Sequence, residues 1–192
     1  MFSNTIPLYL INGFLEGGKT SFIQDVLTNG DFADGQKTLL ILCEEGEVEY
    51  DQSELTNLNI LSLTVDEEKD FNGEYLRNCI RKYRPKRIFV EMNGMWDCKW
   101  MFDSALPREV EIAQVITIVD GSTFQVYVNN MKGILSNLFT YTEMVIFNRC
   151  TEDMPLHSFR RAVRGVNPRA MVYFEDEEGN PVDPGMEERR MI

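Results

Sequence analysis

The sequence predicts an α/β fold in which helices cover both faces of a mainly parallel central sheet, giving a three-layer sandwich. Short apolar runs alternate along the chain with segments of helical periodicity, and this alternation is typical of repeated βαβ units. Several runs are almost entirely apolar, as expected for strands that are buried on both faces. Ligands of such sheets bind at the carboxyl ends of the strands. The residues that follow each strand are therefore the candidates for function.

The expected elements follow one another along one domain. Strands are predicted at seven apolar runs, Pro7–Ile11, Thr38–Cys43, Asn59–Val65, Arg87–Glu91, Val115–Val119, Met144–Phe147 and Ala170–Phe174. Helices are predicted where apolar residues share one face or where a segment stops before a proline, at Thr20–Thr28, Phe71–Tyr83 and Leu156–Val163. The domain is predicted to span residues 1–175. Residues 176–192 are acidic, lack periodicity and are expected to form a flexible tail.

Composition and charge exclude several classes of protein. The net charge of −12 over 192 residues repels phosphate backbones and anionic lipids, so neither nucleic-acid nor membrane-surface binding is expected. The sequence has no apolar run of roughly 18 residues, the length expected of a membrane-spanning helix. The four cysteines are scattered, without the spacing of a disulfide framework or a zinc knuckle. Such cysteines suit a reducing compartment, and we predict a cytoplasmic protein.

A glycine-rich segment follows the first predicted strand. Residues Gly13–Thr20 read GFLEGGKT and satisfy the pattern G-x-x-x-x-G-K-[ST], between a strand and an amphipathic helix. Glycines let backbone N–H groups point inward at phosphate oxygens, and the helix adds its free N-terminal donors. Lys19 would neutralise the β- and γ-phosphates, and Thr20 would bind Mg²⁺. The sequence therefore predicts a P-loop NTPase whose nucleotide contacts here are Gly13, Glu16, Gly17, Gly18, Lys19, Thr20 and Ser21.

Carboxylates follow three of the predicted strands. Five lie within residues 44–51, beginning at Glu44, and Glu91 closes the fourth strand. Asp120, after the fifth strand, either caps the next helix or contacts the ligand. Mg²⁺ favours oxygen ligands, and the predicted metal ligands are Thr20, Glu44 and Glu91. Phosphoryl transfer depends on positioning and charge neutralisation, and the predicted catalytic residues are Lys19, Glu44 and Glu91. The alternatives are a solvated acidic loop and an ordinary polar strand end.

Six short motifs occur in a fixed order along the chain. They are GFLEGGKT at 13–20, CEEGEVEYD at 43–51, EMNG at 91–94, VDG at 119–121, NR at 148–149 and VNPRA at 166–170. This set resembles the CobW/HypB/UreG group of P-loop GTPases, and within it the CobW-like branch. The corresponding motifs of that branch are GFLGAGKT, NEFGEVGID, ExSG, VDA, NKxD and LNPxA. The similarity spans about residues 5–175, nearly the whole chain.

The resemblance implies a Mg²⁺-dependent GTPase, a hydrolase that acts as a nucleotide switch or as a metallochaperone-like accessory factor for a client protein. The residues that would hold phosphate and Mg²⁺ or belong to a switch-like loop are Gly18, Lys19, Thr20, Glu44, Glu47, Asp51 and Glu91. Asn148 would face the base, and the aliphatic stem of Arg149 would lie along it. Homodimers are common among P-loop proteins of this class, so a homodimer is a further expectation.

Three departures from the family pattern bear on function. Thr151 stands where the base motif has an aspartate that accepts the guanine N–H groups, unless Glu152 or Asp153 substitutes for it. ATP is therefore an alternative to GTP. The third strand, Asn59–Val65, lacks the CxCC motif that is thought to bind the cargo metal in the branch. CobW-like proteins usually have a second, C-terminal domain, and this chain is expected to be either a short family member or a piece of a longer protein. A non-hydrolysing or base-promiscuous nucleotide-binding module that regulates a partner protein remains an alternative.

Overall fold

The computed structural model describes most of the chain. Within the ranges given next, the side chains of Asn129 and Lys132 are not described. The described ranges are 5–44, 46, 49–103, 106–130 and 132–182. The chain divides into two compact units, the first reaching to Val115 and the second beginning at Ile116. The predicted phosphate loop lies in the first unit and the predicted base motif in the second.

The first unit is built on parallel strands in the order β3-β2-β4-β1. The strands are β1 (Ile6–Asn12), β2 (Thr38–Leu42), β3 (Ile60–Thr64) and β4 (Arg87–Glu91). Every residue of β4 is buried, because apolar side chains on both faces are covered by helices. This is the strand type that the unbroken apolar runs predict.

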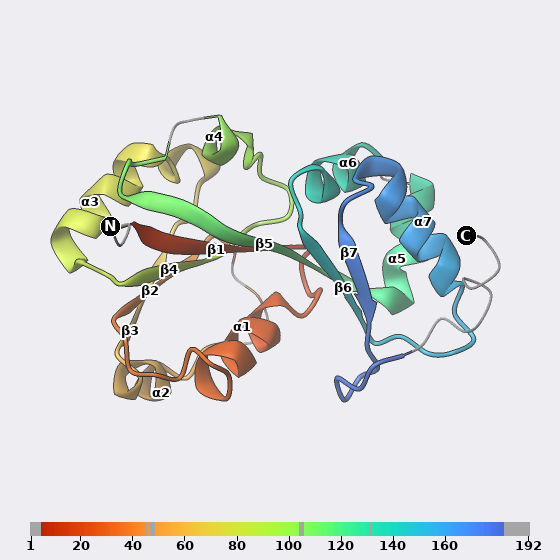
Figure 1. Ribbon diagram of the computed structural model, residues 1–192, viewed down its shortest axis with the longest axis horizontal. Coiled ribbons are helices and arrows are strands. Elements are labelled where there is room, and N and C mark those ends of the chain that lie inside the picture. Colours follow the sequence, from red (N-terminus) through yellow and green to blue (C-terminus); the bar gives the residue numbers. More distant parts are fainter. Residues whose placement is uncertain (1–4, 45, 47–48, 104–105, 131, 183–192) are drawn as a thin grey trace. The chain divides into compact units, whose positions relative to one another are not determined.

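Helices lie on both sides of this sheet, with α3 and α4 on one side and α1 and α2 on the other (Figure 1). The helical segments are α1 (Lys19–Thr28), α2 (Gln52–Asn57), the short 3-10 helix η1 (Glu68–Asp70), α3 (Gly73–Tyr83) and α4 (Lys99–Phe102). The first unit therefore has the three layers that the sequence predicts.

The register of the strands brings their carboxyl ends to one edge. Glu91, the last residue of β4, lies opposite both Ile11 of β1 and Leu42 of β2. Leu42 lies in turn opposite Thr64, the last residue of β3. The loops that leave β1, β2 and β4 therefore start side by side, which is where parallel sheets bind their ligands.

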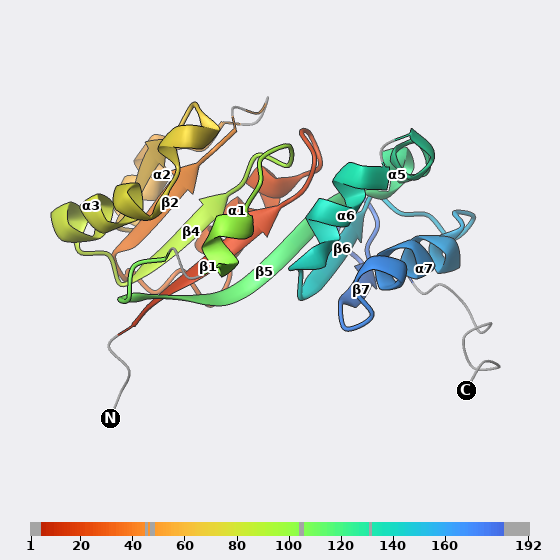
Figure 2. The ribbon, with the colours of Figure 1, turned by 90° about the horizontal axis from the view of Figure 1, so that it is seen from above.

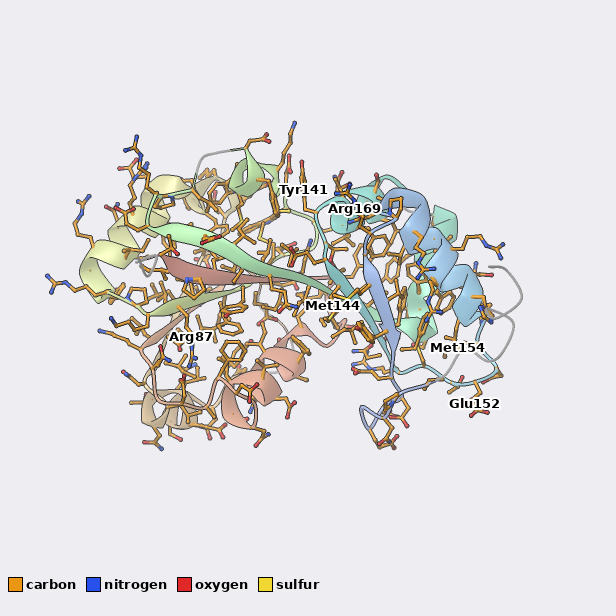
Figure 3. All side chains as sticks on the ribbon, in the orientation of Figure 1. Arg87, Tyr141, Met144, Glu152, Met154 and Arg169 are labelled. Carbon is orange, nitrogen blue, oxygen red and sulfur yellow. The ribbon has the colours of Figure 1, made fainter. Side chains whose placement is uncertain are left out.

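Arg87 anchors the opposite, amino end of β4 (Figure 3). Its buried guanidinium donates to Asp34 Oδ1 at 2.7 Å, to the Phe32 carbonyl oxygen at 2.5 Å and to Thr38 Oγ1 at 2.7 Å. A buried charge needs such acceptors to offset its desolvation. The hydrogen bond from Arg87 lowers the pKa of Asp34. This cluster fixes the start of β4 far from the strand ends that carry the predicted site.

The second unit has its own parallel strand order, β5-β6-β7. The strands are β5 (Val110–Asp120), β6 (Met144–Asn148) and β7 (Met171–Phe174), and β5 enters the unit at Ile116. The helices α5 (Gly121–Asn130), α6 (Lys132–Thr140) and α7 (Leu156–Val166) pack against one another. Figure 2 shows them beside β6 and β7.

Aromatic side chains form much of the core of the second unit. Phe124 packs edge-to-face against Phe147 and Phe159, with ring centroids 4.8 and 4.9 Å apart. Phe147 also stacks on Phe174 at 5.3 Å. Aromatic pairs in such arrangements add to the stabilisation from buried area. These rings join α5 and α7 to β6 and β7.

The structure confirms the predicted fold class and all seven strands. The largest difference is in β5, which begins at Val110 instead of Val115, because residues 110–114 alternate between buried or half-buried and exposed positions and so lack an unbroken apolar run. The helices α2, α4 and α6 were not predicted, and α5 was expected only as the helix after Asp120. None of the described helices combines the length and apolar content needed to cross a bilayer.

The segment after β7 begins with a turn. Asp176 Oδ1 accepts hydrogen bonds from the N–H groups of Glu178 and Asn180, at 3.0 and 2.7 Å. Val182 N–H then donates to the Phe174 carbonyl oxygen at 2.9 Å. Residues 183–192 lie outside the described part of the chain, so the flexible tail over 176–192 and the domain limit at 175 stay predictions.

Candidate functional site

The predicted phosphate loop, Gly13–Thr20, connects β1 to α1. Gly13 and Gly18 have φ values of 144° and 94°, a region that glycine adopts without steric cost. Asn12 Oδ1 accepts a hydrogen bond from the Gly13 N–H at 2.9 Å and so fixes the start of the loop. Gly18 is the N-cap of α1, and among the described residues no side chain caps this helix. The first N–H groups of α1 therefore fit an anion.

Lys19 is buried inside this loop, with an exposed fraction of 3%. Its Nζ donates to the carbonyl oxygens of Gly13 and Phe14, at 2.9 and 2.8 Å, and to Glu44 Oε2 at 2.5 Å. The three N–H groups of the ammonium therefore have three acceptors, of which the Glu44 carboxylate is charged. The Glu44 carboxylate therefore lies against the lysine as a phosphate oxygen would in a P-loop.

Glu91 is buried at the end of β4, with an exposed fraction of 4%. Thr20 Oγ1 donates to Glu91 Oε1, and the Tyr50 hydroxyl donates to Glu91 Oε2, both at 2.6 Å. Burial, and then the charge and hydrogen bond of Glu91, raise the pKa of the Tyr50 hydroxyl. The tyrosine therefore remains a hydrogen-bond donor at neutral pH.

Gly94, three residues after β4, lies directly against the phosphate loop. A Cβ atom at this position would be 2.2 Å from the Gly13 carbonyl oxygen and 3.2 Å from Phe14 Cα. No side chain fits such a distance, since the contact is with backbone. The loop after Glu91 and the phosphate loop are therefore packed together through their main chains.

The acidic run at 44–51 has more than one structural role. Glu44 pairs with Lys19. Asp51 caps α2, because its Oδ1 accepts hydrogen bonds from the N–H groups of Ser53 and Glu54 at 2.8 and 3.2 Å. Glu47, expected in the switch-like loop, lies outside the described residues. The assignments of Glu44 as a catalytic residue and a metal ligand stay predictions.

A cavity of about 320 Å³ opens between the ends of β2, β3 and β4. Its polar lining includes Thr20, Glu44, Glu49, Tyr50, Gln52 and Glu91. Hydroxyl and carboxylate oxygens of this kind fit Mg²⁺, which prefers oxygen ligands and keeps several waters. The ammonium of Lys19 and the start of α1 fit phosphate. The residues present therefore suit a magnesium–nucleotide complex.

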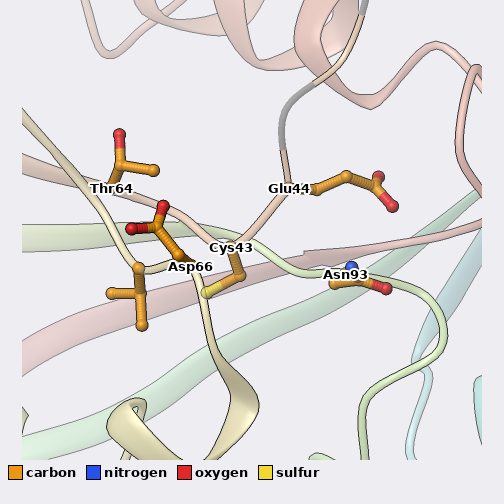
Figure 4. Close-up of a pocket in the computed structure, with 6 residues that line it drawn as sticks. Cys43, Glu44, Thr64, Asp66 and Asn93 are labelled. Carbon is orange, nitrogen blue, oxygen red and sulfur yellow. The ribbon is translucent and has the colours of Figure 1, made fainter.

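A second cavity of about 430 Å³ lies beside Cys43, at the end of β2 (Figure 4). In Figure 4 the Glu44 carboxylate points away from Asp66, so the acidic groups do not converge. Burial, and then the charges of Glu91 and Glu44, raise the pKa of the Cys43 thiol to about 12. Within the described ranges, no group of three His, Cys, Asp or Glu side chains could hold a metal ion.

The predicted base motif lies at the end of β6 in the second unit. Asn148 is the last residue of β6, and Arg149 follows it with a φ of 52°. Arg149 Nη1 donates to Asp120 Oδ2 at 2.5 Å. Asp120 Oδ1 accepts from the N–H group of Ser122, in the first turn of α5, at 2.8 Å. Of the two roles open for Asp120, the structure shows the helix cap and adds an ion pair with Arg149.

The loop after Arg149 carries Thr151, Glu152 and Asp153, all exposed (Figure 3 labels Glu152). A hydrogen bond from the Thr151 side chain lowers the pKa of Asp153. The carboxylate of Asp153 is thus already bound to the residue that replaces the family aspartate. The alternative that Glu152 or Asp153 substitutes for the family aspartate stays a prediction.

The comparison with known families agrees with this geometry. The model of the CobW/HypB/UreG nucleotide-binding domain matches residues 7–174. The chain belongs to the CobW/HypB/UreG family. Among curated proteins it is 30% identical over 146 residues to "Zinc chaperone CobW" from Sinorhizobium sp.. That match covers 61% of this chain and 37% of the relative, so this CobW/HypB/UreG chain spans little more than a third of that protein's length.

Solved structures of the CobW/HypB/UreG type share the fold. The Zn(II)-bound YjiA GTPase from E. coli has a TM-score of 0.64 and 22% identity, covering 88% of this chain and 57% of that one. The hydrogenase maturation factor HypB from Archaeoglobus fulgidus has a TM-score of 0.61 and 11% identity, covering 93% and 85%. At these identities the likeness supports the P-loop NTPase fold alone.

The structure brings together four residues of the predicted site, Lys19, Thr20, Glu44 and Glu91, within the first unit. Ser21 is exposed on α1, and Asn148 and Arg149 lie in the second unit. Tyr50 was not singled out from the sequence. The sequence did contain a signal for Tyr50. The family run NEFGEVGID has isoleucine at this position, so Tyr50 places a hydroxyl near the predicted metal ligands where the family has an apolar side chain.

Proposed function

We propose that this chain is a Mg²⁺-dependent GTP-binding domain that hydrolyses GTP slowly and switches the state of a client protein. The observation that carries the proposal is the 2.6 Å hydrogen bond from Thr20 to Glu91, next to the buried ammonium of Lys19. A P-loop needs these three groups together, because the hydroxyl and carboxylate serve the metal while the ammonium serves the phosphates.

The proposed roles follow from charge and position. Lys19 and the N–H groups of Gly13–Thr20 would bind the phosphates, and Thr20 and Glu91 would hold Mg²⁺ and its waters. Glu91 or Glu44 would orient the attacking water. When bound, Mg²⁺ would neutralise charge on the phosphates. Asn148 and Arg149 would face the base.

Nucleotide binding is the first test, with a fluorescent GTP analogue and excess Mg²⁺. Lys19→Ala should weaken binding by about 100-fold, since charge-assisted hydrogen bonds to phosphate are lost. Lys37→Ala is the matched control, because Lys37 is exposed and lies before β2 at the opposite edge of the sheet. Equal affinity of wild type and Lys19→Ala, or no affinity in the wild type, would refute the proposal.

Hydrolysis and base preference separate the proposal from a second candidate. The replacement of the family aspartate by Thr151, whose side chain bonds Asp153, favours a module that binds purine nucleotides promiscuously or without hydrolysis. Phosphate release that is lost in Lys19→Ala would support the GTPase. Tight binding without phosphate release, or equal competition by GTP and ATP, would support the second candidate.

A metallochaperone-like role for a client protein is the further part of the proposal. It is supported by the likeness to a protein described as a zinc chaperone. The chain should then form a nucleotide-dependent complex with its client, either alone or as a homodimer. Sedimentation with GTP, with GDP and without nucleotide tests the dimer: an unchanged monomer in all three states would exclude it.

A further inference from the structure

Tyr50 is bound to the buried carboxylate of Glu91 although nothing in the phosphate-loop motif requires it. Its hydroxyl donates to Glu91 Oε2 at 2.6 Å, and its side chain is 9% exposed. Thr20 Oγ1 donates to the other oxygen, Oε1, at the same distance. The two oxygens of Glu91 are therefore held by donors from two different segments, the start of α1 and the residue before the N-cap of α2.

This double contact fixes the orientation of the carboxylate. A carboxylate held at one oxygen can rotate about its last side-chain bond, whereas one held at both oxygens cannot rotate without breaking a hydrogen bond. Hydrogen bonds to a charged acceptor are among the stronger ones, and leaving a buried oxygen of Glu91 without a donor would be unfavourable. Tyr50 therefore keeps Oε1 of Glu91 directed at the Thr20 hydroxyl.

Residues close to Tyr50 in the chain also make defined contacts. The next residue, Asp51, caps α2 and accepts hydrogen bonds from Ser53 and Glu54. At the beginning of the same segment, Glu44 contacts Lys19. Glu44 and Tyr50 thus contact the two sides of the candidate site, Glu44 at the phosphate-binding Lys19 and Tyr50 at the metal side, Glu91.

We propose that Tyr50 is a positioning residue that orients Glu91 for the Thr20 hydroxyl and for Mg²⁺. This inference rests on the proposed nucleotide function. Tyr50 would act on metal binding through Glu91 and would leave the phosphate contacts of Lys19 unchanged. Its removal should therefore change the magnesium requirement of nucleotide binding, and it should not change nucleotide affinity in the absence of magnesium.

The test uses the full chain with a fluorescent GTP analogue, first in EDTA and then in a Mg²⁺ titration. Tyr50→Phe keeps the ring and removes only the hydroxyl. We expect unchanged affinity in EDTA and an increase of about 10-fold in the Mg²⁺ concentration at half effect, as for the loss of one hydrogen bond to a charged group. Tyr173→Phe is the control, since that ring is half exposed on β7 in the second unit.

A second variant guards against a packing effect. Tyr50→Ile also lacks the hydroxyl and carries the residue of the related family run, so it should share the shift in Mg²⁺ requirement. Thermal unfolding of each variant without nucleotide reports folding separately.

The outcomes distinguish the inference from the proposed function. If the wild type binds no nucleotide, both fail. If the wild type binds with a clear Mg²⁺ dependence and Tyr50→Phe has the same one, only the role of Tyr50 is refuted. A variant that loses affinity equally in EDTA and in Mg²⁺ would also refute it, because that pattern indicates a general loss of structure.

Discussion

Two predicted motifs, the phosphate loop in the first unit and the base motif in the second, differ in how closely they follow the family pattern. In the first unit, Lys19, Thr20 and Glu91 keep the motif residues, and each has a partner. In the second unit, Thr151 replaces the aspartate of the base motif, and Arg149 replaces lysine and pairs with Asp120. The phosphate loop therefore keeps the family motif, whereas the base motif departs from it.

The difference has a physical reason. Phosphate binding depends on backbone N–H groups, glycine conformations and the start of a helix, so it is spread over many atoms that must fit together. Base discrimination depends on one carboxylate that accepts two N–H groups. A single substitution can therefore change base preference without disturbing the fold. The following predictions test this contrast between the units.

The largest effect is expected where the backbones touch. Gly94→Ala should lower the free energy of unfolding by about 3 kcal/mol and weaken nucleotide binding, because its Cβ would lie 2.2 Å from the Gly13 carbonyl oxygen. Gly165→Ala on α7 is the control, since a Cβ there has nothing within 4 Å, and it should be neutral or stabilising. Urea unfolding measures both. Equal stability of the two variants would contradict the packed arrangement of the first unit.

Base preference should respond to one substitution in the second unit. Thr151→Asp should raise the preference for GTP over ATP by about 10- to 100-fold, since a carboxylate can accept both guanine N–H groups. Thr151→Asn keeps a similar size but offers only one acceptor oxygen, and it should give a smaller gain. Competition of unlabelled GTP and ATP against a fluorescent analogue measures the ratio. An unchanged ratio in Thr151→Asp would mean that other residues read the base.

The contact between Glu44 and Lys19 should oppose phosphate binding. Glu44→Gln keeps a hydrogen-bond acceptor but removes the charge, so in EDTA it should tighten GTP binding by about 5-fold. Glu49→Gln removes one charge from the same cavity, but Glu49 is exposed and its loss should have a smaller effect. If both variants gain the same GTP affinity, the gain comes from the lower negative charge of the cavity and not from the contact of Glu44 with Lys19.

The ion pair of Asp120 and Arg149 should contribute a small, pH-dependent stability. Burial opposes ionisation of Asp120, but hydrogen bonds from Ser122 and Arg149 outweigh it and lower the pKa below 3.8. Asp120→Asn can still cap α5, so at pH 7 it should cost at most about 1 kcal/mol.

Because the folded-state pKa is lowered, this stability is present above pH 3.8 and is lost as the pH falls through the folded-state pKa. Urea unfolding of wild type and Asp120→Asn should therefore show a smaller difference in the free energy of unfolding at pH 3 than at pH 7. A difference that is the same at both pH values would indicate that the charge of Asp120 contributes nothing. Binding of inorganic triphosphate should be the same in both proteins.

The smallest effect is expected at Glu16, which adopts a φ of 60° in the phosphate loop, where the related motif has glycine. Glycine removes the left-handed strain but adds freedom to the unfolded chain. Glu16→Gly should therefore raise the free energy of unfolding by only about 0.5 kcal/mol. Thermal unfolding measures it, with Glu152→Gly in the exposed loop after β6 as the control. A loss of stability would show that the Glu16 side chain contributes more than its backbone costs.

The sequence predicted the strands and the phosphate loop because both depend on local patterns. It could not choose among the five carboxylates of residues 44–51, since the pairing of Glu44 with Lys19 depends on where β2 ends relative to β1. The contact of Tyr50 depends likewise on the register that sets Leu42 opposite Glu91. Helix α6, with the sequence KGILSNLFT, has its apolar residues at the spacing of one helical face, and Leu135, Leu138 and Phe139 are buried. The sequence therefore carried a signal for α6 that the prediction did not use.

Strand β4 is tethered at both of its tips. At its amino end Arg87 donates hydrogen bonds to Asp34, Phe32 and Thr38. At its carboxyl end Glu91 accepts hydrogen bonds from Thr20 and Tyr50. A strand tethered in this way cannot slide along its neighbours. Strand β4 therefore holds Glu91 at a constant position along the sheet, opposite Ile11 of β1 and Leu42 of β2.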